Sequence, residues 1–136
     1  MMYQFREEKK IENLQLLTLY KSVGWSAYTN NPETLIKGIA QSLKVMTAWH
    51  NQRLIGLIRV VGDGQTIIYI QDILVHPDYH DQGIGSKLME KMLAAYQGVR
   101  QFVLMTEDGP KVRAFYEKHG FKSCDQGSVV SFAIFK

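Results

Sequence analysis

The chain has 136 residues, of which 46% are hydrophobic and 21% charged, with a formal net charge of +3, and these ordinary globular values predict a single domain over residues 1–136. The mildly basic balance suits an anionic small ligand, but lysine and arginine are scattered rather than gathered along one helix, which argues against nucleic-acid binding. The single cysteine, Cys124, excludes a disulfide framework and a thiolate zinc site, and the absence of a signal peptide or an apolar run of ~20 residues predicts a cytoplasmic protein with no membrane partner.

The first half of the chain predicts two helices and a β-meander. A short strand over residues 3–6 comes first, and an amphipathic helix over 11–24 follows, because its apolar residues recur three or four positions apart. A loop carrying Trp25 and Tyr28 comes next, and Pro32 then opens a second helix that runs to residue 43. Turn residues separate the expected strands of the meander, which span 44–49, 54–61 and 66–75.

The second half predicts one parallel crossover at the centre of the sheet. The strand TIIYIQDILV is almost continuously apolar, which favours burial on both faces. It leads into a helix over 83–97 and a short strand over 102–105, and together these form a βαβ unit. A helix over 109–119, ended by Gly120, and two closing strands over 121–123 and 128–135 complete the chain. The expected fold is α+β: a mostly antiparallel twisted sheet with one βαβ crossover and helices on both faces.

The turn before the crossover helix, HPDYHDQGIGSK, places Gly83 and Gly85 where the helix begins. The first turn of a helix has unpaired backbone N–H groups and the positive end of the helix dipole, and glycine lets an anion approach closely. A tight strand-to-helix connection explains the same glycines, so spacing alone leaves both interpretations open. The turn matches neither a dinucleotide-binding GxGxxG nor a GxxxxGK[ST] loop.

Two motifs resemble the GNAT superfamily of acyl-CoA-dependent N-acetyltransferases. The family pattern of an apolar pair, an x-Pro turn and [Gln/Arg]-x-x-Gly-x-[Gly/Ala] is similar to Leu74-Val75, His76-Pro77 and HDQGIG at residues 80–85. About 35 residues downstream, the Tyr-x-x-x-Gly-Phe end of a second family pattern matches residues 116–121, although the alanine stands two residues before the tyrosine instead of four. The order of the expected elements also matches the family along nearly the whole chain.

This resemblance implies that acetyl-CoA is the co-substrate and that it binds at the turn. The backbone of Ile73, Leu74 and Val75 would pair with the pantetheine arm like an added strand, in a gap left by a splay of the neighbouring strand. The pyrophosphate would be held by the amides at the helix start, the Ser86 hydroxyl and the charge of Lys87; the amides belong to Gln82, Gly83, Ile84, Gly85 and Ser86.

His80 departs from the family pattern, which has Gln or Arg at this position. A neutral imidazole has one N–H donor, against five in a guanidinium. CoA affinity would depend on pH if the bound phosphates protonate His80. The alternative is a turn residue that faces solvent.

The resemblance makes Tyr116 the general acid that protonates the leaving thiolate, with core packing beside Phe115 and Phe121 as the alternative. A phenol with a pKa of about 10 is a suitable proton donor to a thiolate whose conjugate thiol has a pKa of about 8.5. The base that deprotonates the amine stays open. Asp72 is the only carboxylate on the central strand, and it is either the base or a structural hydrogen-bonding residue.

Two further groups bear on the base and its surroundings. As the alternative to Asp72 acting as the base, Tyr69 or Gln71 would hold a water molecule that carries the proton of the amine away. By strand alternation, Asp72 is expected on one face with Ile70 and Leu74, whereas Tyr69 and Gln71 lie with Ile73 on the other.

The loop between the first two helices usually forms the acceptor wall in this superfamily. Trp25 and Tyr28 are therefore expected to bind the acceptor, a small-molecule or peptide amine, with anchoring of the loop to the core as the alternative. His76 and His80, with Asp72 or Asp78, raise the question of a metal. No metal site is expected, because Pro77 and the glycines prevent one helix from presenting both rings.

The leading hypothesis is an acetyl-CoA-dependent N-acetyltransferase in which the amine attacks directly in a ternary complex. Cys124 has no neighbouring histidine motif and does not favour an acyl-cysteine intermediate. A non-catalytic acyl-CoA-binding sensor or regulatory module on the same fold is the alternative. The strand over 128–135 is a candidate surface for a homodimer, whereas the acceptor and the acyl chain length do not follow from the sequence.

Overall fold

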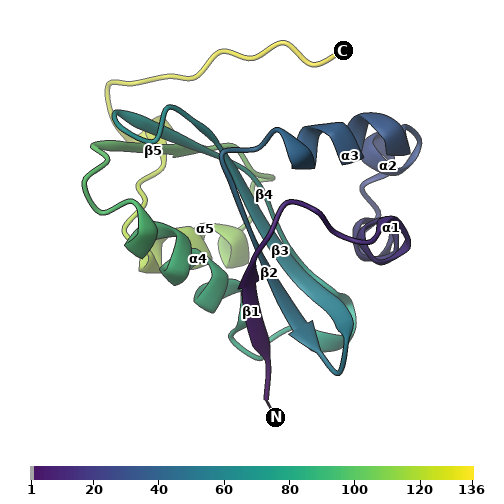
Figure 1. Cartoon of the computed structure of the whole chain (residues 1–136). Coiled ribbons are helices and arrows are strands. Elements are labelled where there is room, and N and C mark those ends of the chain that lie inside the picture. Colours follow the sequence, from purple (N-terminus) through teal and green to yellow (C-terminus); the bar gives the residue numbers. More distant parts are fainter. Residues whose placement is uncertain (1) are drawn as a thin grey trace. The chain divides into compact units, whose positions relative to one another are not determined.

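A computed structural model describes residues 2–136 (Figure 1). The chain divides into two compact units, with the boundary between Met105 and Thr106. The single domain expected over residues 1–136 stays a prediction. Within the described residues, no helix combines the length and the apolar character needed to cross a membrane.

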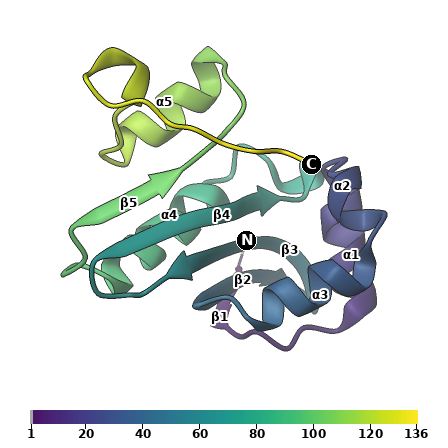
Figure 2. The same ribbon diagram turned by 90° about the horizontal axis from the view of Figure 1, so that it is seen from above.

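The first unit is built on a mixed five-stranded sheet with helices on both faces (Figure 2). The strands lie in chain order, antiparallel from β1 to β4 and parallel between β4 and β5. They are β1 (Gln4–Glu7), β2 (Lys44–His50), β3 (Arg53–Gly62), β4 (Ile67–Val75) and β5 (Gln101–Leu104). This arrangement confirms the predicted fold class.

The helices of the first unit cover both faces of this sheet (Figure 1). One face carries α1 (Asn13–Ser22), α2 (Ser26–Thr29) and α3 (Pro32–Ala40), and α4 (Ile84–Ala95) lies on the opposite face. The short helix α2 occupies part of the segment predicted to be a loop, where Trp25 precedes its first residue.

Alternation along the strands supplies a hydrophobic core beneath α1 and α3. A fully buried aliphatic side chain contributes about 1.5–3 kcal/mol relative to an exposed one, and this core is made of Leu16, Leu19, Tyr20, Leu35, Ile39, Val45, Trp49, Leu54, Leu57 and Leu74. On the opposite face, Gly56 lets α4 approach the sheet. A Cβ atom at Gly56 would lie 3.2 Å from Ile84 and 3.3 Å from Leu88, so a larger residue there would push the start of α4 away.

A β-bulge interrupts the pairing of β3 and β4. Arg59 pairs with Asp72 and Val60 pairs with Ile70, so Gln71 is an extra residue without a partner on β3. The predicted alternation across this point was wrong, because the extra residue resets which side chains share a face. Through their β3 partners, Asp72 and Leu74 share a face with Tyr69, whereas Ile70 lies on the other face with Ile73.

The second unit contains α5 (Pro110–Lys118) and a 3-10 turn over Cys124–Gln126. The two closing strands predicted over 121–123 and 128–135 were wrong, since none of residues 121–136 is in a strand. Apolar alternation predicts a strand only where a partner edge exists, and residues 106–136 contain no other strand to supply a ladder. Phe132 is accordingly 93% exposed.

Candidate active site

One edge of β4 is open beyond the point where β5 ends. β5 pairs with β4 only over residues 67–70, so residues 71–75 have no strand partner on that side among the described residues. β4 therefore has the unpaired edge that the predicted splay would leave. Apolar strand content alone predicts a strand in the centre of the sheet, but only half of this strand has neighbours on both sides.

The register shows which backbone groups face the open edge. The His76 N–H donates to the carbonyl of Ile55, a residue of β3, at 2.8 Å. Because backbone groups alternate in direction along an antiparallel strand, Leu74 also directs its N–H and C=O toward β3, whereas Ile73 and Val75 direct theirs toward the open edge. Of the three residues predicted to bind pantetheine, two are therefore suited to do so through the backbone.

The turn between β4 and α4 presents backbone amides to open space. Asp81 and Gly83 have positive φ angles of 61° and 79°, and the first helical hydrogen bond runs from Lys87 N–H to the Gly83 carbonyl at 3.0 Å. Helix geometry leaves amides such as those of Ile84 and Gly85 without an acceptor in the helix. A Cβ atom at Gly83 would meet no atom within 4 Å, so an anion has room to approach these amides.

The side chains of the predicted pyrophosphate residues differ in exposure. Gln82 and Lys87 are exposed, and Ser86 is half-buried. The side-chain oxygen of Gln82 accepts a hydrogen bond from the Tyr3 hydroxyl. Lys87 is therefore the residue of this turn whose charge is available to an anion in solvent.

His80 ties the turn to the end of β4. Its Nε2 atom lies 2.8 Å from the Val75 carbonyl oxygen. Because a carbonyl oxygen only accepts, this contact makes Nε2 the protonated nitrogen. The turn residue predicted to touch phosphate or solvent thus has a third role, which is to hold the strand end and the turn together. Within residues 2–136, no three His, Cys, Asp or Glu side chains form a group that would hold a metal.

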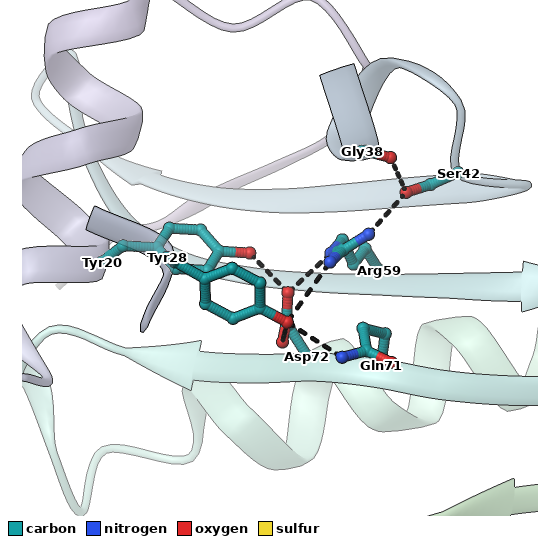
Figure 3. Close-up of polar contacts among 7 residues, drawn as sticks. All are labelled: Tyr20, Tyr28, Gly38, Ser42, Arg59, Gln71 and Asp72. Atoms are coloured by element: carbon teal, nitrogen blue, oxygen red, sulfur yellow. Dashed lines mark hydrogen bonds and ion pairs between the residues drawn. The ribbon is translucent and has the colours of Figure 1, made fainter. Parts of the chain in front are cut away.

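Asp72 is the centre of a buried hydrogen-bond network beneath α1 and α2 (Figure 3). The residue is only 4% exposed. Its Oδ2 atom accepts from Arg59 Nε at 2.5 Å and from the Tyr20 hydroxyl at 2.9 Å, and its Oδ1 atom accepts from the Tyr28 hydroxyl at 2.8 Å. Arg59 also reaches Ser42 Oγ, at 3.3 Å, next to the end of α3. The network therefore joins β3 and β4 to all three helices on this face.

The electrostatics of the network favour a structural role for Asp72. Burial, reinforced by the charge of Asp72, raises the pKa of Tyr20 far above its usual range. Burial alone would lower the pKa of Arg59, but the charge of Asp72 and its hydrogen bond raise the pKa overall. Asp72 is thus a carboxylate with three firm donors and almost no solvent contact, which suits an anchor better than a base that must meet an incoming amine.

Trp25 and Tyr28 belong to an aromatic cluster with Tyr20. The ring centroids lie 6.0 Å apart for Tyr20 and Trp25, and 5.3 Å apart for Tyr20 and Tyr28. Both predicted acceptor residues are half-buried, so they anchor α2 and still reach the surface. The Tyr28 hydroxyl also accepts a hydrogen bond from Gln71 Nε2 at 2.9 Å. Arg59 was not identified from the sequence as a partner of Asp72. The available signal was a single arginine inside the apolar strand LIGLIRVV, next to a strand with a single aspartate.

Tyr116 lies in α5 of the second unit. Its ring centroid is 5.1 Å from that of Phe115 and 5.9 Å from that of Phe121. The Phe121 N–H donates to the Tyr116 carbonyl at 3.1 Å, while Gly120 has a φ of 91°, so the Tyr-x-x-x-Gly-Phe motif ends the helix and folds Phe121 onto the tyrosine. Burial raises the pKa of Tyr116, and a hydrogen bond with Thr106 offsets only part of this rise. The phenol is therefore protonated at neutral pH, as a proton donor must be.

Comparisons with known proteins point to one family. Residues 41–123 match a family model described as "Acetyltransferase (GNAT) domain". An uncharacterised N-acetyltransferase from Prochlorococcus marinus is 29% identical over 96% of this chain and 73% of its own length, and an uncharacterised relative from Gracilaria tenuistipitata is 30% identical over 76% of this chain and 58% of its own. A solved GNAT-family acetyltransferase from Streptococcus pneumoniae has a TM-score of 0.88 with 31% identity, covering 99% of this chain and 98% of that one. A probable acetyltransferase from Staphylococcus aureus has a TM-score of 0.78 with 27% identity, covering 98% of this chain and 100% of that one.

Proposed function

Because the chain belongs to the GNAT family of N-acetyltransferases, we propose that it transfers an acetyl group from acetyl-CoA to a primary amine by direct attack in a ternary complex. The observation that carries this proposal is the unpaired edge of β4 at residues 71–75, which the chain follows with a glycine turn that has open space beside Gly83. An extended chain with hydrogen-bonding groups and an anionic end is the ligand that such an edge and turn suit.

The residues present fit acetyl-CoA. The backbone N–H and C=O groups of Ile73 and the N–H of Val75, whose carbonyl already accepts from His80, would pair with the amide groups of the pantetheine arm. The amides of Gly83, Ile84 and Gly85 would bind the pyrophosphate, and the open space beside Gly83 leaves room for it. Acetyl-CoA supplies the acetyl group as a thioester, which is activated toward an amine.

The reaction also requires two proton transfers, one to the departing thiolate and one from the attacking amine. The Tyr116 phenol holds the proton that a departing thiolate requires, and its raised pKa keeps that proton in place until it is needed. Direct attack also requires the amine to lose a proton to water or to a base. The buried position of Asp72 makes a water at the exposed end of the network the better acceptor for that proton.

An acetyl-CoA turnover screen against a panel of amines, which measures the release of free thiol, tests this proposal. Tyr116→Phe distinguishes an enzyme from a non-catalytic acyl-CoA sensor. An enzyme would lose about 10²–10⁴-fold in kcat, the usual contribution of general acid catalysis, and would keep its affinity for CoA in calorimetry. If the wild-type chain binds CoA but turns over no amine, the sensor hypothesis replaces the enzyme.

A further inference from the structure

The buried ion pair imposes one direction on the chain of hydrogen bonds that links Asp72 through Tyr28 to Gln71 (Figure 3). Asp72 is paired with Arg59 at 2.5 Å, and an ionised carboxylate can only accept hydrogen bonds. The Tyr28 hydroxyl must therefore use its single hydrogen toward Asp72 Oδ1, 2.8 Å away. Burial and the charge of Asp72 raise the pKa of Tyr28 despite the opposing hydrogen bond from Gln71, so this hydrogen stays in place.

The oxygen of Tyr28 can then only accept, and this settles the orientation of Gln71. The Tyr28 oxygen accepts from Gln71 Nε2 at 2.9 Å and from Arg59 NH2 at 3.3 Å. The nitrogen and oxygen of a glutamine amide are assigned from the surrounding hydrogen bonds. Here a flipped amide would place its oxygen against an oxygen that has no hydrogen left to donate. The Gln71 side-chain oxygen must therefore point away from Tyr28.

Gln71 also stands at the place where an acceptor would arrive. It is exposed, and it is the extra residue of the β-bulge, at the first position of β4 that β5 leaves open. Ile73, whose backbone faces the same open edge, lies two residues further, or about 6–7 Å along the strand. No hydrogen-bond partner of the Gln71 side-chain oxygen is found among residues 2–136.

We propose that the side-chain oxygen of Gln71 binds an N–H group of the acceptor amine, and that Tyr28, Asp72 and Arg59 are positioning residues that hold this oxygen in place. This assignment rests on the acetyltransferase function proposed above. It deepens that function by naming the group that selects a hydrogen-bond donor at the acceptor nitrogen. The half-buried rings of Trp25 and Tyr28 form the neighbouring surface of α2, which suits the carbon chain next to an amine.

Gln71→Met tests the contact, since methionine has a similar shape but no amide. We expect kcat/KM for the amine to fall about tenfold, the effect of one hydrogen bond to a polar or charged partner, while KM for acetyl-CoA changes less than about twofold. Gln65→Met is the matched control, because Gln65 is an exposed glutamine in the turn between β3 and β4. This control variant should match the wild type in both constants.

A double-mutant cycle with Tyr28→Phe tests the positioning role. Tyr28→Phe should lower kcat/KM for the amine severalfold in the wild-type background and leave it unchanged in the Gln71→Met background, because the tyrosine acts through the glutamine. In the free protein, Tyr28→Phe should also move the side-chain amide resonance of Gln71 and leave that of Gln65 in place. A purely structural tyrosine would give additive losses instead.

The outcomes separate this inference from the function on which it rests. An active wild-type chain whose Gln71→Met variant keeps its amine kcat/KM overturns the contact and leaves the acetyltransferase function standing. Additive effects in the cycle, or an unmoved Gln71 resonance, overturn the positioning role alone. A wild-type chain that binds CoA but neither binds nor acetylates any amine overturns both.

Discussion

Asp72→Asn is the substitution that most directly probes the buried network. Asparagine keeps the shape of the side chain but removes its charge, which leaves Arg59 without a counterion while its side chain is 9% exposed. Breaking a buried ion pair from one side costs about 3–5 kcal/mol. A domain of this size is stable by about 5–15 kcal/mol in total, so the loss is a large fraction of its stability. The corresponding drop in Tm is about 10–17 °C, from the usual unfolding entropy per residue.

The assay is urea unfolding followed by tryptophan fluorescence. Both tryptophans, Trp25 and Trp49, belong to the first unit, so the signal reports on the part of the chain that holds the network. The matched control is the double replacement of Asp72→Leu with Arg59→Met, which removes both charges and should recover most of the loss. The reasoning is refuted if the unfolding free energy of Asp72→Asn lies within about 1 kcal/mol of the wild-type value, which is the range of an exposed ion pair. It is also refuted if the double replacement is no more stable than Asp72→Asn.

Three further predictions concern pH and the cofactor turn. The raised pKa of Tyr20 keeps its phenol neutral in the fold while the unfolded chain ionises above about pH 10. This residue alone should therefore lower the unfolding free energy by ~1.4 kcal/mol per pH unit there. Tyr20→Phe should make the total slope less steep by that amount in urea titrations at pH 9–11. Gly83→Ala forces a φ of 79° on a residue with a Cβ atom, costing about 1–2 kcal/mol, and should raise KM for acetyl-CoA about tenfold while the amine KM stays unchanged. His80→Ala removes the bond to the Val75 carbonyl and should weaken CoA binding about tenfold in calorimetry, the effect of one hydrogen bond that orders the turn; equal affinity would show that the turn keeps its shape without it.

The parts of the fold that follow from the sequence are those with a repeated signal. The apolar strand TIIYIQDILV, the glycine turn and the amphipathic α4 each have several residues that agree, and the structure places them as predicted. The turn expected between the first two strands of the meander also follows from its residues: Asn51 and Gln52 there have positive φ angles, which asparagine tolerates well. The core beneath α1 and α3 follows in the same way, because it forms when the apolar faces of these helices pack on the apolar face of the sheet.

The parts that did not follow depend on one residue or on a missing partner. A single extra residue at Gln71 leaves no trace in an apolar run, yet it reverses the facing of every side chain before or after it. The segment over 128–135 has the composition of a strand, but composition does not supply the edge that a strand requires. Likewise, no pattern in the sequence announces that His80 turns back to a carbonyl five residues earlier.

The bulge at Gln71 connects the two halves of the candidate site. Without an extra residue there, Asp72 would fall on the face of Ile70 and Val60, opposite to the face that carries Arg59, and its buried charge would lose this counterion. With the bulge, Asp72 lies under α1 and α2 next to Arg59, and its network fixes Tyr28. The same extra residue stands where β5 ends its pairing with β4, so the residue that turns Asp72 inward is itself exposed at the open edge. The anchoring of α1 and α2 and the exposure of Gln71, the residue that we propose binds the amine, therefore have one structural cause.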